Sequence, residues 1–200
     1  MISVQLFFGI LSIIPAVLAY VFYFRDMFAG KTKPHAFSWL IWGILAGNGF
    51  IAQVSAQAGI GAWVTGLTSA ACLTIFFVTV LRKGDTRLIR LDWALLALAL
   101  TAFALLFVVS DPTLSLCLTL FATLLGFTMT IRKAYYRPHE ETARAFLLNA
   151  LKFAPAIVAL GSFSFLTVAY PLTAGLANVT VVGVIYIRRR QLALRERKGY

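Results

Sequence analysis

The chain has 200 residues, of which 60% are hydrophobic and only 12% are charged, and its mean hydropathy is +0.87. Soluble domains carry about 25% charged residues, so this composition excludes a soluble globule and indicates an all-α integral membrane protein. The net charge of +11 does not indicate nucleic-acid binding, because the basic residues lie in short segments between apolar runs, as topology signals do. We therefore expect a lipid bilayer and no nucleic acid among the partners.

Seven apolar runs are long enough to cross about 30 Å of hydrocarbon, and each must be a helix to satisfy its own backbone hydrogen bonds. The first run lacks a preceding basic segment and a small-residue cleavage pattern, so we interpret it as a retained span rather than a signal peptide. The turn around Gly161–Pro171 is the least defined boundary. The seven expected spans are 3–24, 36–57, 60–82, 91–110, 112–131, 145–166 and 169–188.

Lys and Arg occur in every second connection between these runs, and the other connections carry one charge, Asp111. The basic segments are 25–35, 82–92, 132–144 and the tail from Arg188 onward. This alternation predicts seven spans with the N-terminus outside and the C-terminus inside. We expect the basic inner loops and the tail 191–200 to contact anionic lipids; for the tail, the alternative is an attachment surface for another protein.

The first and fifth runs are followed by similar segments, "RDMFAGKTKPHAFSW" and "RKAYYRPHEETARAF". Each begins at an Arg, reaches a basic residue followed by Pro-His, and re-enters an apolar run at Ala-Phe. The repeat predicts two three-helix units, 1–84 and 111–190, joined by a linker helix within 85–110. One intervening helix makes the two units parallel, about an axis along the membrane normal, so a binding site is expected near the midplane where they meet.

This three-one-three arrangement resembles the SWEET and PQ-loop transporter superfold, whose architecture the KDEL receptor and Pnu-type nicotinamide-riboside transporters share. The segment "KPHAFSWLIWG" resembles a bacterial branch of it. The resemblance implies a small multi-pass carrier in the cytoplasmic (inner) membrane that moves a small polar or anionic organic solute, such as a sugar-type metabolite, by uniport-like alternating access. The alternative is a non-transporting receptor or assembly subunit with the same fold.

The resemblance also points to particular positions. Where PQ-loop proteins carry Pro-Gln, this chain has Tyr23-Phe24 and Met129-Thr130. SWEETs bind sugar through two asparagines; Asn178 matches one of them, and Cys72 stands at the other position. Pro15 and Pro155 match positions at which SWEET helices bend, so the resemblance implies that they act as hinges.

Polar residues inside the spans are candidate binding residues, because an unpaired polar group in hydrocarbon costs several kcal/mol. At a rise of about 1.5 Å per residue, four positions fall at a common depth near the midplane and form a candidate substrate layer. The alternative for the two asparagines among them is hydrogen bonding between helices. The four positions are Asn48, Cys72, Pro155 and Asn178.

Two further groups of residues allow two interpretations each. Trp39 and Trp42 lie one turn apart near the inner end of the second span. They are either an interfacial aromatic pair or a gate and wall on which a ring-shaped substrate stacks. Thr65, Ser69 and Cys72 share a face of the third span and form either a packing seam or a set of ligands.

Lys152 is the most informative residue, because a charge at this depth costs at least about 2.5–3.5 kcal/mol. It shares one side of the sixth span with Asn149 and Pro155, and the equivalent residue of the first repeat is Leu45. No Asp or Glu lies inside a span to pair with it. Its ammonium would therefore snorkel to the interface, face a wet cavity or an anionic ligand, lose its charge, or bind a backbone carbonyl.

Enzymatic and metal chemistry have no support in the sequence. It contains no nucleophile–base pair, glycine-rich phosphate loop or carboxylate pair, so we expect no catalytic residue. His35 and His139 lie in the basic turns and the two cysteines are isolated, so neither a metal nor a cofactor is expected. A retinal Schiff base on Lys152 would need a carboxylate counter-ion within the spans. The sequence leaves homo-oligomerisation open.

Overall fold

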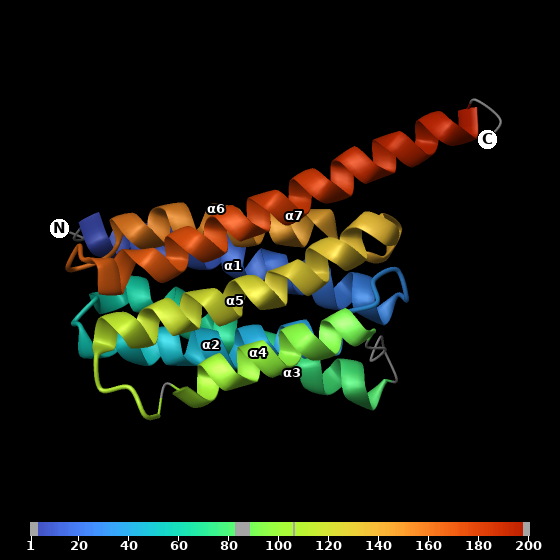
Figure 1. The fold of residues 1–200 in the computed structure, drawn as a ribbon. Helices are drawn as coiled ribbons and strands as arrows, with labels where there is room; N and C mark the ends of the chain where they lie inside the picture. Colours follow the sequence, from blue (N-terminus) through green and yellow to red (C-terminus); the bar gives the residue numbers. More distant parts are fainter. Residues whose placement is uncertain (1–3, 83–88, 106, 198–200) are drawn as a thin grey trace.

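The computed structural model describes residues 4–82, 89–105 and 107–197, which are helical apart from their connections (Figure 1). Of the charged residues expected in loops, Lys83, Asp85, Arg87 and Lys198 lie outside the described residues. Two 3-10 turns, η1 (Gly59–Ala62) and η2 (Pro138–Glu140), connect longer elements. The α-helices are α1 (Val4–Phe28), α2 (Ala36–Ser55), α3 (Trp63–Leu81), α4 (Arg90–Leu105), α5 (Pro112–Tyr136), α6 (Ala143–Val158) and α7 (Phe165–Arg197).

Five helices are long and apolar enough to cross a membrane: α1, α2, α3 with its preceding turn, α5 and α7. Large apolar side chains face outward on them; Phe7 and Ile14 of α1 are about half exposed, whereas Ala16 and Ala19 on its inner face are fully buried. Small residues between helices and large apolar residues outside are typical of helices packed in lipid. These are the features of a multi-pass membrane protein.

The expected boundary between the last two runs is wrong. The sixth helix ends at Val158, not near residue 166, and α7 begins at Phe165. Pro171, which we took for part of the turn, lies inside α7 because its helix defect is repaired. A proline cannot donate to the carbonyl four residues earlier, and the Thr167 carbonyl instead accepts a hydrogen bond from Gln53 Nε2 of α2 at 3.1 Å.

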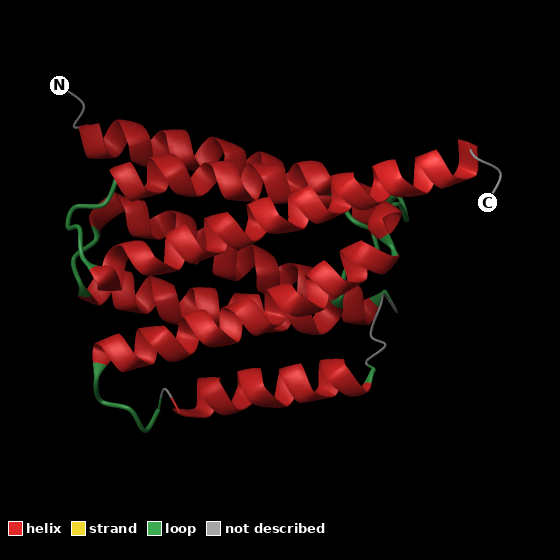
Figure 2. Cartoon of the chain, turned by 45° about the horizontal axis from the view of Figure 1, so that its top comes forward, coloured by secondary structure: helices red, strands yellow, loops and turns green. Residues whose placement is uncertain are grey.

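Residues 191–197 of the expected basic tail are helical and continue α7. The last helix runs on to Arg197 and projects beyond the rest of the bundle, as Figures 1 and 2 show. Two arginines of α7 bind backbone carbonyls at the end of α5 and in the connection after it. Arg188 Nε donates to the Tyr135 carbonyl, and Arg189 donates to the carbonyls of Pro138 and Glu141. The helix therefore continues because its first basic turn is held by backbone acceptors.

The helix contacts follow one pattern twice. The third helix packs against both α1 and α2, and α7 packs against both α5 and α6. Between these groups α1 packs on α6, and α5 packs on α2. Exchanging α1–α3 for α5–α7 leaves this set of contacts unchanged, and α1 and α5 run in the same direction (Figure 1). The fourth helix lies at one edge, against α5 (Figure 2).

The two ends of the bundle differ in charge. We call the end that holds the connections 29–35 and 137–142 the basic end, because the described Lys and Arg side chains gather there. The opposite end holds the connections 56–62, 107–111 and 159–164, in which Asp111 is the one charged residue among those described. Helices α1, α3, α5 and α7 run toward the basic end (Figure 1).

Gly61 tests how closely the two groups meet at the opposite end. A Cβ there would lie 2.8 Å from the Ala156 carbonyl oxygen of α6, a backbone atom that cannot turn aside. We expect Gly61→Ala to lower the free energy of unfolding by about 1–3 kcal/mol, measured by thermal unfolding in detergent. Gly183→Ala is the control; a Cβ there meets nothing within 4 Å, so the helix should gain up to about 1 kcal/mol. Equal effects of the two variants would contradict the close approach.

Candidate functional site: a closed cavity between the helix groups

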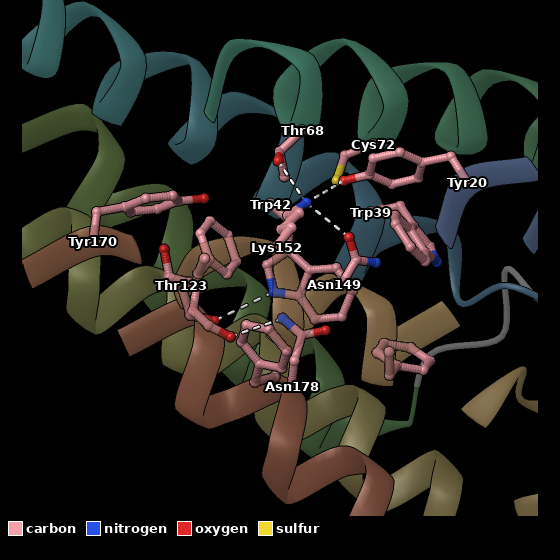
Figure 3. A pocket seen from close by; sticks show the side chains of 14 residues that line it. Tyr20, Trp39, Trp42, Thr68, Cys72, Thr123, Asn149, Lys152, Tyr170 and Asn178 are labelled. Carbon is pink, nitrogen blue, oxygen red and sulfur yellow. Dashed lines mark hydrogen bonds between the residues drawn. The ribbon is translucent and has the colours of Figure 1, made fainter. Parts of the chain in front are cut away.

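A cavity lies in the middle of the bundle and is lined by every helix except α4 (Figure 3). Its free volume is about 30 Å³, which is room for about two water molecules. The side chains therefore leave little free space in the cavity. Its lining residues are Tyr20, Trp39, Trp42, Thr68, Cys72, Thr123, Phe127, Phe146, Asn149, Lys152, Phe153, Tyr170, Ala174 and Asn178.

The lining repeats between the two groups of helices. Tyr20, Trp39 and Trp42 each have a counterpart in the lining at the spacing that separates Arg25 from Arg132, namely Phe127, Phe146 and Asn149. The spacing from Arg82 to Arg188 likewise relates Thr68 to Ala174 and Cys72 to Asn178. Positions related by these spacings thus line the cavity in pairs.

Lys152 is the centre of the site. Its side chain is fully buried, and Nζ donates to Thr68 Oγ1 and Asn149 Oδ1, both at 2.7 Å, and to the Tyr20 hydroxyl at 3.0 Å. These three acceptors account for the three donors of an ammonium group. Figure 3 shows Nζ at the meeting point of these side chains. Because Tyr20 and Thr68 belong to α1 and α3, the lysine of α6 joins one helix group to the other.

The charge of Lys152 has no counter-ion in the cavity. None of the described lining residues is Asp or Glu, and the three acceptors are neutral. The rings of Tyr20 and Phe153 lie 4.9 Å from Nζ and add weak cation–π stabilisation. Burying an ammonium without an opposite charge costs several kcal/mol after relaxation. The surroundings therefore solvate a positive charge on Lys152 but do not neutralise it.

Aromatic side chains close the cavity toward the basic end. Tyr23, Trp39 and Phe146 lie on the basic-end side of the cavity, because α1 runs toward that end and α2 and α6 start from it. Trp39 Nε1 donates to the Tyr23 hydroxyl at 3.1 Å, and their ring centroids are 4.6 Å apart. The Phe146 ring meets Tyr23 edge-on at 6.3 Å. These three rings separate the Lys152 amine from the charged connections.

A different contact closes the cavity on its other side. Tyr170, near the start of α7, packs on α2 where Gly49 makes room; a Cβ there would lie 3.3 Å from the tyrosine ring. Beyond it the connections of the two groups are joined through the backbone: Gly161 N donates to the Ala58 carbonyl at 3.1 Å, and Ser162 Oγ donates to the Ala56 carbonyl at 3.2 Å. This closure is uncharged.

At the basic end the two groups are joined by a charged cluster, which we call the latch. Asp26 of α1 accepts hydrogen bonds from Arg144 Nη2 at 3.0 and 3.1 Å and from Thr142 Oγ1 at 3.2 Å. Thr32 and Thr142 hydrogen-bond through their hydroxyls, and Lys33 pairs with Glu140 at 3.3 Å. The latch comprises Asp26, Thr32, Lys33, Lys133, Glu140, Glu141, Thr142 and Arg144.

Lys133 lies at the core of the latch. Its ammonium is 2.7 Å from Glu141 Oε1 and also donates to the Lys33 carbonyl; both side chains of the pair are almost fully buried. Burial raises the pKa of Glu141, and the neighbouring Lys133 ammonium offsets this only in part. A second buried carboxylate, Asp92 of α4, pairs with Arg132. The basic residues here thus hold carboxylates in addition to marking one end of the molecule.

The structure brings most of the sequence-derived candidates together. Lys152, Asn149, Asn178, Cys72, Trp39 and Trp42 all line the one cavity. Lys152 does not snorkel, since its side chain is fully buried, and its printed partners are side chains rather than a backbone carbonyl. Trp39 and Trp42 are buried and are not an interfacial pair.

Other candidates lie outside the cavity lining. Asn48 is half-buried and donates to Thr119 Oγ1 of α5 at 2.8 Å, so it joins helices instead of lining the cavity. Pro15 and Pro155 lie inside α1 and α6, half-buried and outside the lining. Of the four residues expected in one layer, only Cys72 and Asn178 line the cavity. Equal depth in the membrane does not mean that two side chains point the same way.

The seam on the third helix is divided in a similar way. Ser69 Oγ donates to the Gly43 carbonyl of α2 at 2.7 Å, and Thr65 is buried but does not line the cavity. Thr68, which we did not single out, holds the lysine, as does Tyr20. Thr68 lies one turn before Cys72 and Tyr20 one turn before Phe24, so helical spacing from a chosen residue was the available signal.

Comparison of the chain with protein-family models, with curated proteins and with solved structures finds no match in any of the three. Within the described residues, no three His, Cys, Asp or Glu side chains gather so that they could hold a metal ion. Cys72 and Cys117 are free thiols, the first buried in the cavity wall and the second exposed on α5. The function therefore has to be argued from the cavity itself.

The two buried lysines should respond oppositely to removal of their charge. We expect Lys152→Met to leave the free energy of unfolding unchanged or to raise it, because the uncompensated charge is removed while the side-chain length is kept. Lys133→Met should lower it by about 3–5 kcal/mol, because Glu141 is left buried without its partner. Thermal unfolding of both variants in one detergent is the measurement. A loss for Lys152→Met as large as that for Lys133→Met would make Lys152 a structural clamp.

Proposed function

We propose that the chain is a seven-span carrier that moves a small polar or anionic organic solute across the bacterial inner membrane by alternating access. The observation that carries this proposal is a cavity that holds a buried lysine among aromatic rings, lies between two helix groups, and is bounded toward each end by a different set of contacts between them. A carrier needs a central site that can open to either side, and repeat interfaces provide it.

The proposed topology takes the basic end as cytoplasmic, since Lys and Arg are retained on that side of bacterial membranes. The chain then starts outside and ends inside. Helices α4 and α6 have 16 residues each, or about 24 Å, which is short for an independent span. The sixth helix is enclosed by α1 and α7, and apolar residues 107–109 follow α4, so both fit a seven-span arrangement.

The proposed movement is a rocking of α1–α3 against α5–α7, with the cavity near its axis. The matching contacts of the two groups and the paired lining positions support this division. Bends at Pro15 and Pro155 would contribute, because each proline removes one helix hydrogen bond. The lining has no carboxylate among its described residues, so uniport-like movement fits better than coupling to a proton carried on Asp or Glu.

Opening at the basic end is energetically accessible. Most latch contacts involve partly exposed side chains, such as Arg144 and Lys33, and ion pairs of this kind contribute about 0–1 kcal/mol each. Both members of the buried Lys133–Glu141 pair belong to the second group, so the pair can move with that group without breaking. Rocking then has to break the contacts from Asp26, Thr32 and Lys33 to the other group, which include the bond from Lys133 to the Lys33 carbonyl and the backbone bond from Lys33 N to the Glu140 carbonyl.

Solute counterflow in proteoliposomes tests the proposal. We expect saturable counterflow for at least one of a set of sugars, nucleosides, amino acids and small organic anions. Thr32→Cys with Thr142→Cys, in a chain with Cys72 and Cys117 changed to serine, gives the matched control, because the same protein is assayed oxidised and reduced. Oxidation should lock the latch and abolish flux. Absence of flux for all solutes in the reduced protein, or unchanged flux after oxidation, would contradict the proposal.

Native Cys72 reports opening of the cavity. In a Cys117→Ser chain we expect a soluble thiol reagent to modify Cys72 slowly, because the cavity is closed at both ends. Asp26→Asn should increase the rate about fivefold, since it weakens bonds to Arg144 and Thr142 worth about 1 kcal/mol once solvent screening is allowed for. Asp111→Asn, an exposed cap at the opposite end, should leave the rate unchanged. Equal rates in both variants would contradict a role for the latch.

The projecting part of α7 favours one second candidate, a receptor or assembly subunit that uses this fold to bind a protein. Its exposed basic turns extend past the other helices (Figure 2), where a protein could attach as readily as anionic lipid. Co-purification separates the two functions: a stoichiometric protein partner supports the receptor, and a monodisperse chain with ligand-dependent melting supports the carrier.

A further inference from the structure

We infer that the cavity recognises a small planar monoanion, such as an aromatic monocarboxylate, through the ammonium of Lys152. This inference rests on the proposed carrier function and names its substrate class. It follows from three properties of the cavity: one uncompensated cation, few other free polar groups, and walls made largely of rings.

The first property sets the charge of the solute. Nζ of Lys152 is bonded only to neutral oxygens, and a carboxylate oxygen is a stronger acceptor for an ammonium than a hydroxyl or an amide. An anion that enters the cavity therefore gains bonds and neutralises a buried charge, whereas a cation meets repulsion. Lys152 is the one cationic residue in the described lining, so one negative charge is matched and a second is not.

The second property argues against a polyhydroxylated solute. Recognition of several hydroxyls needs several polar groups that can exchange partners, but most of those in the cavity already donate to other groups of the protein. Thr68 and Thr123 donate to the carbonyls of Val64 and Thr119. The Asn178 amide donates to the Ala174 carbonyl at 2.7 Å. The Lys152 ammonium differs from these groups, since it donates to side-chain oxygens, two of them on the other helix group.

The third property sets the shape of the solute. Seven of the fourteen lining residues are aromatic, and they come from both helix groups. Trp42 forms part of a wall of packed rings, tilted by 38° against Phe127 at 4.4 Å between centroids and edge-on to Trp39 at 5.2 Å. Flat side chains of this kind gain contact area and favourable ring geometry with a planar partner. A ring or conjugated acid fits these walls better than a saturated one.

Binding would also loosen the closed state. A free volume of about 30 Å³ is far below the roughly 150 Å³ of a cavity that takes up benzene, so the groups must part to admit a ring. When a carboxylate accepts hydrogen bonds from the ammonium, it replaces Tyr20 and Thr68 as acceptors. These two residues are the acceptors on the first helix group. The anion thus removes a bridge between the groups as it binds.

Binding to the purified chain in detergent, measured by titration calorimetry at neutral pH, tests this inference. The probes are benzoate, neutral benzamide, cationic benzylammonium and saturated cyclohexanecarboxylate. We expect benzamide to bind at least about tenfold more weakly than benzoate, since its carbonyl can still accept from the ammonium but brings no negative charge to it. The saturated acid should bind about two- to tenfold more weakly, and benzylammonium should not bind. Equal affinity for benzamide overturns the charge assignment, and equal affinity for the saturated acid overturns the planar one.

Two variants assign the effect to Lys152. Lys152→Met should abolish benzoate binding, whereas Lys31→Met, at an exposed position in the basic connection, should not change it. Tyr20→Phe should strengthen binding by about two- to tenfold, because it keeps the ring and removes one acceptor that competes for the ammonium. Unchanged binding in Lys152→Met, or weaker binding in Tyr20→Phe, overturns the inference.

Failure of this inference is distinguishable from failure of the proposed function. If no anion binds but a neutral solute shows counterflow that oxidation of the latch abolishes, the chain is a carrier of another class of solute. If benzoate binds through Lys152 and no solute shows counterflow, the binding site is supported and the carrier function is contradicted.

Discussion

The burial of one ammonium group governs the design of this protein. Lys152 carries a charge to the contact between two helix groups and finds three neutral acceptors there, two of them on the opposite group. The surroundings solvate the charge without neutralising it, which a purely structural residue would have no reason to require. The rings toward the basic end and Tyr170 toward the other keep the site closed to both sides, so the charge is met only by what the cavity admits.

The other buried lysine, Lys133, has the ion pair that is typical of a structural cation. Lys133 pairs with a buried glutamate and a backbone carbonyl, and the pair lies within one helix group. The contacts that cross between groups at that end are partly exposed ion pairs, hydroxyl bonds, the bond from Lys133 to the Lys33 carbonyl, and a backbone bond from Lys33 N to the Glu140 carbonyl at 3.2 Å. A buried ion pair therefore strengthens the second group, whereas the side-chain ion pairs that join the two groups at this end are partly exposed and weaker. The opposite end joins the groups through close glycine packing and backbone hydrogen bonds.

The sequence predicted the helices well and the site in part, for separable reasons. Apolar runs indicate helices directly, so seven α-helices were expected and seven are described. The boundary near Pro171 was wrong because Gln53, distant in sequence, supplies the hydrogen-bond donor that the proline lacks. Depth along a helix placed Cys72 and Asn178 in the site but also suggested Asn48, which points toward Thr119. Rotation about the helix axis depends on packing partners that a single sequence does not show. The same limit hid Tyr20 and the ion pairs of the basic loops, whose charges suggested only topology.

The two helix groups share one arrangement, and the site arises where their sequences differ. Ring positions are kept on both sides of the cavity, as Tyr20 with Phe127 and Trp39 with Phe146 show. The counterpart of Lys152 is Leu45, which is buried in an apolar cluster with Leu95 and Leu96 of α4. The linker helix α4 thus packs near the position at which a second lysine would lie. The cavity therefore has one lysine, on the second helix group, and no equivalent on the first. A solute with one charged end and one flat end would then bind in one orientation, with its charged end toward the second group and its ring between walls supplied by both.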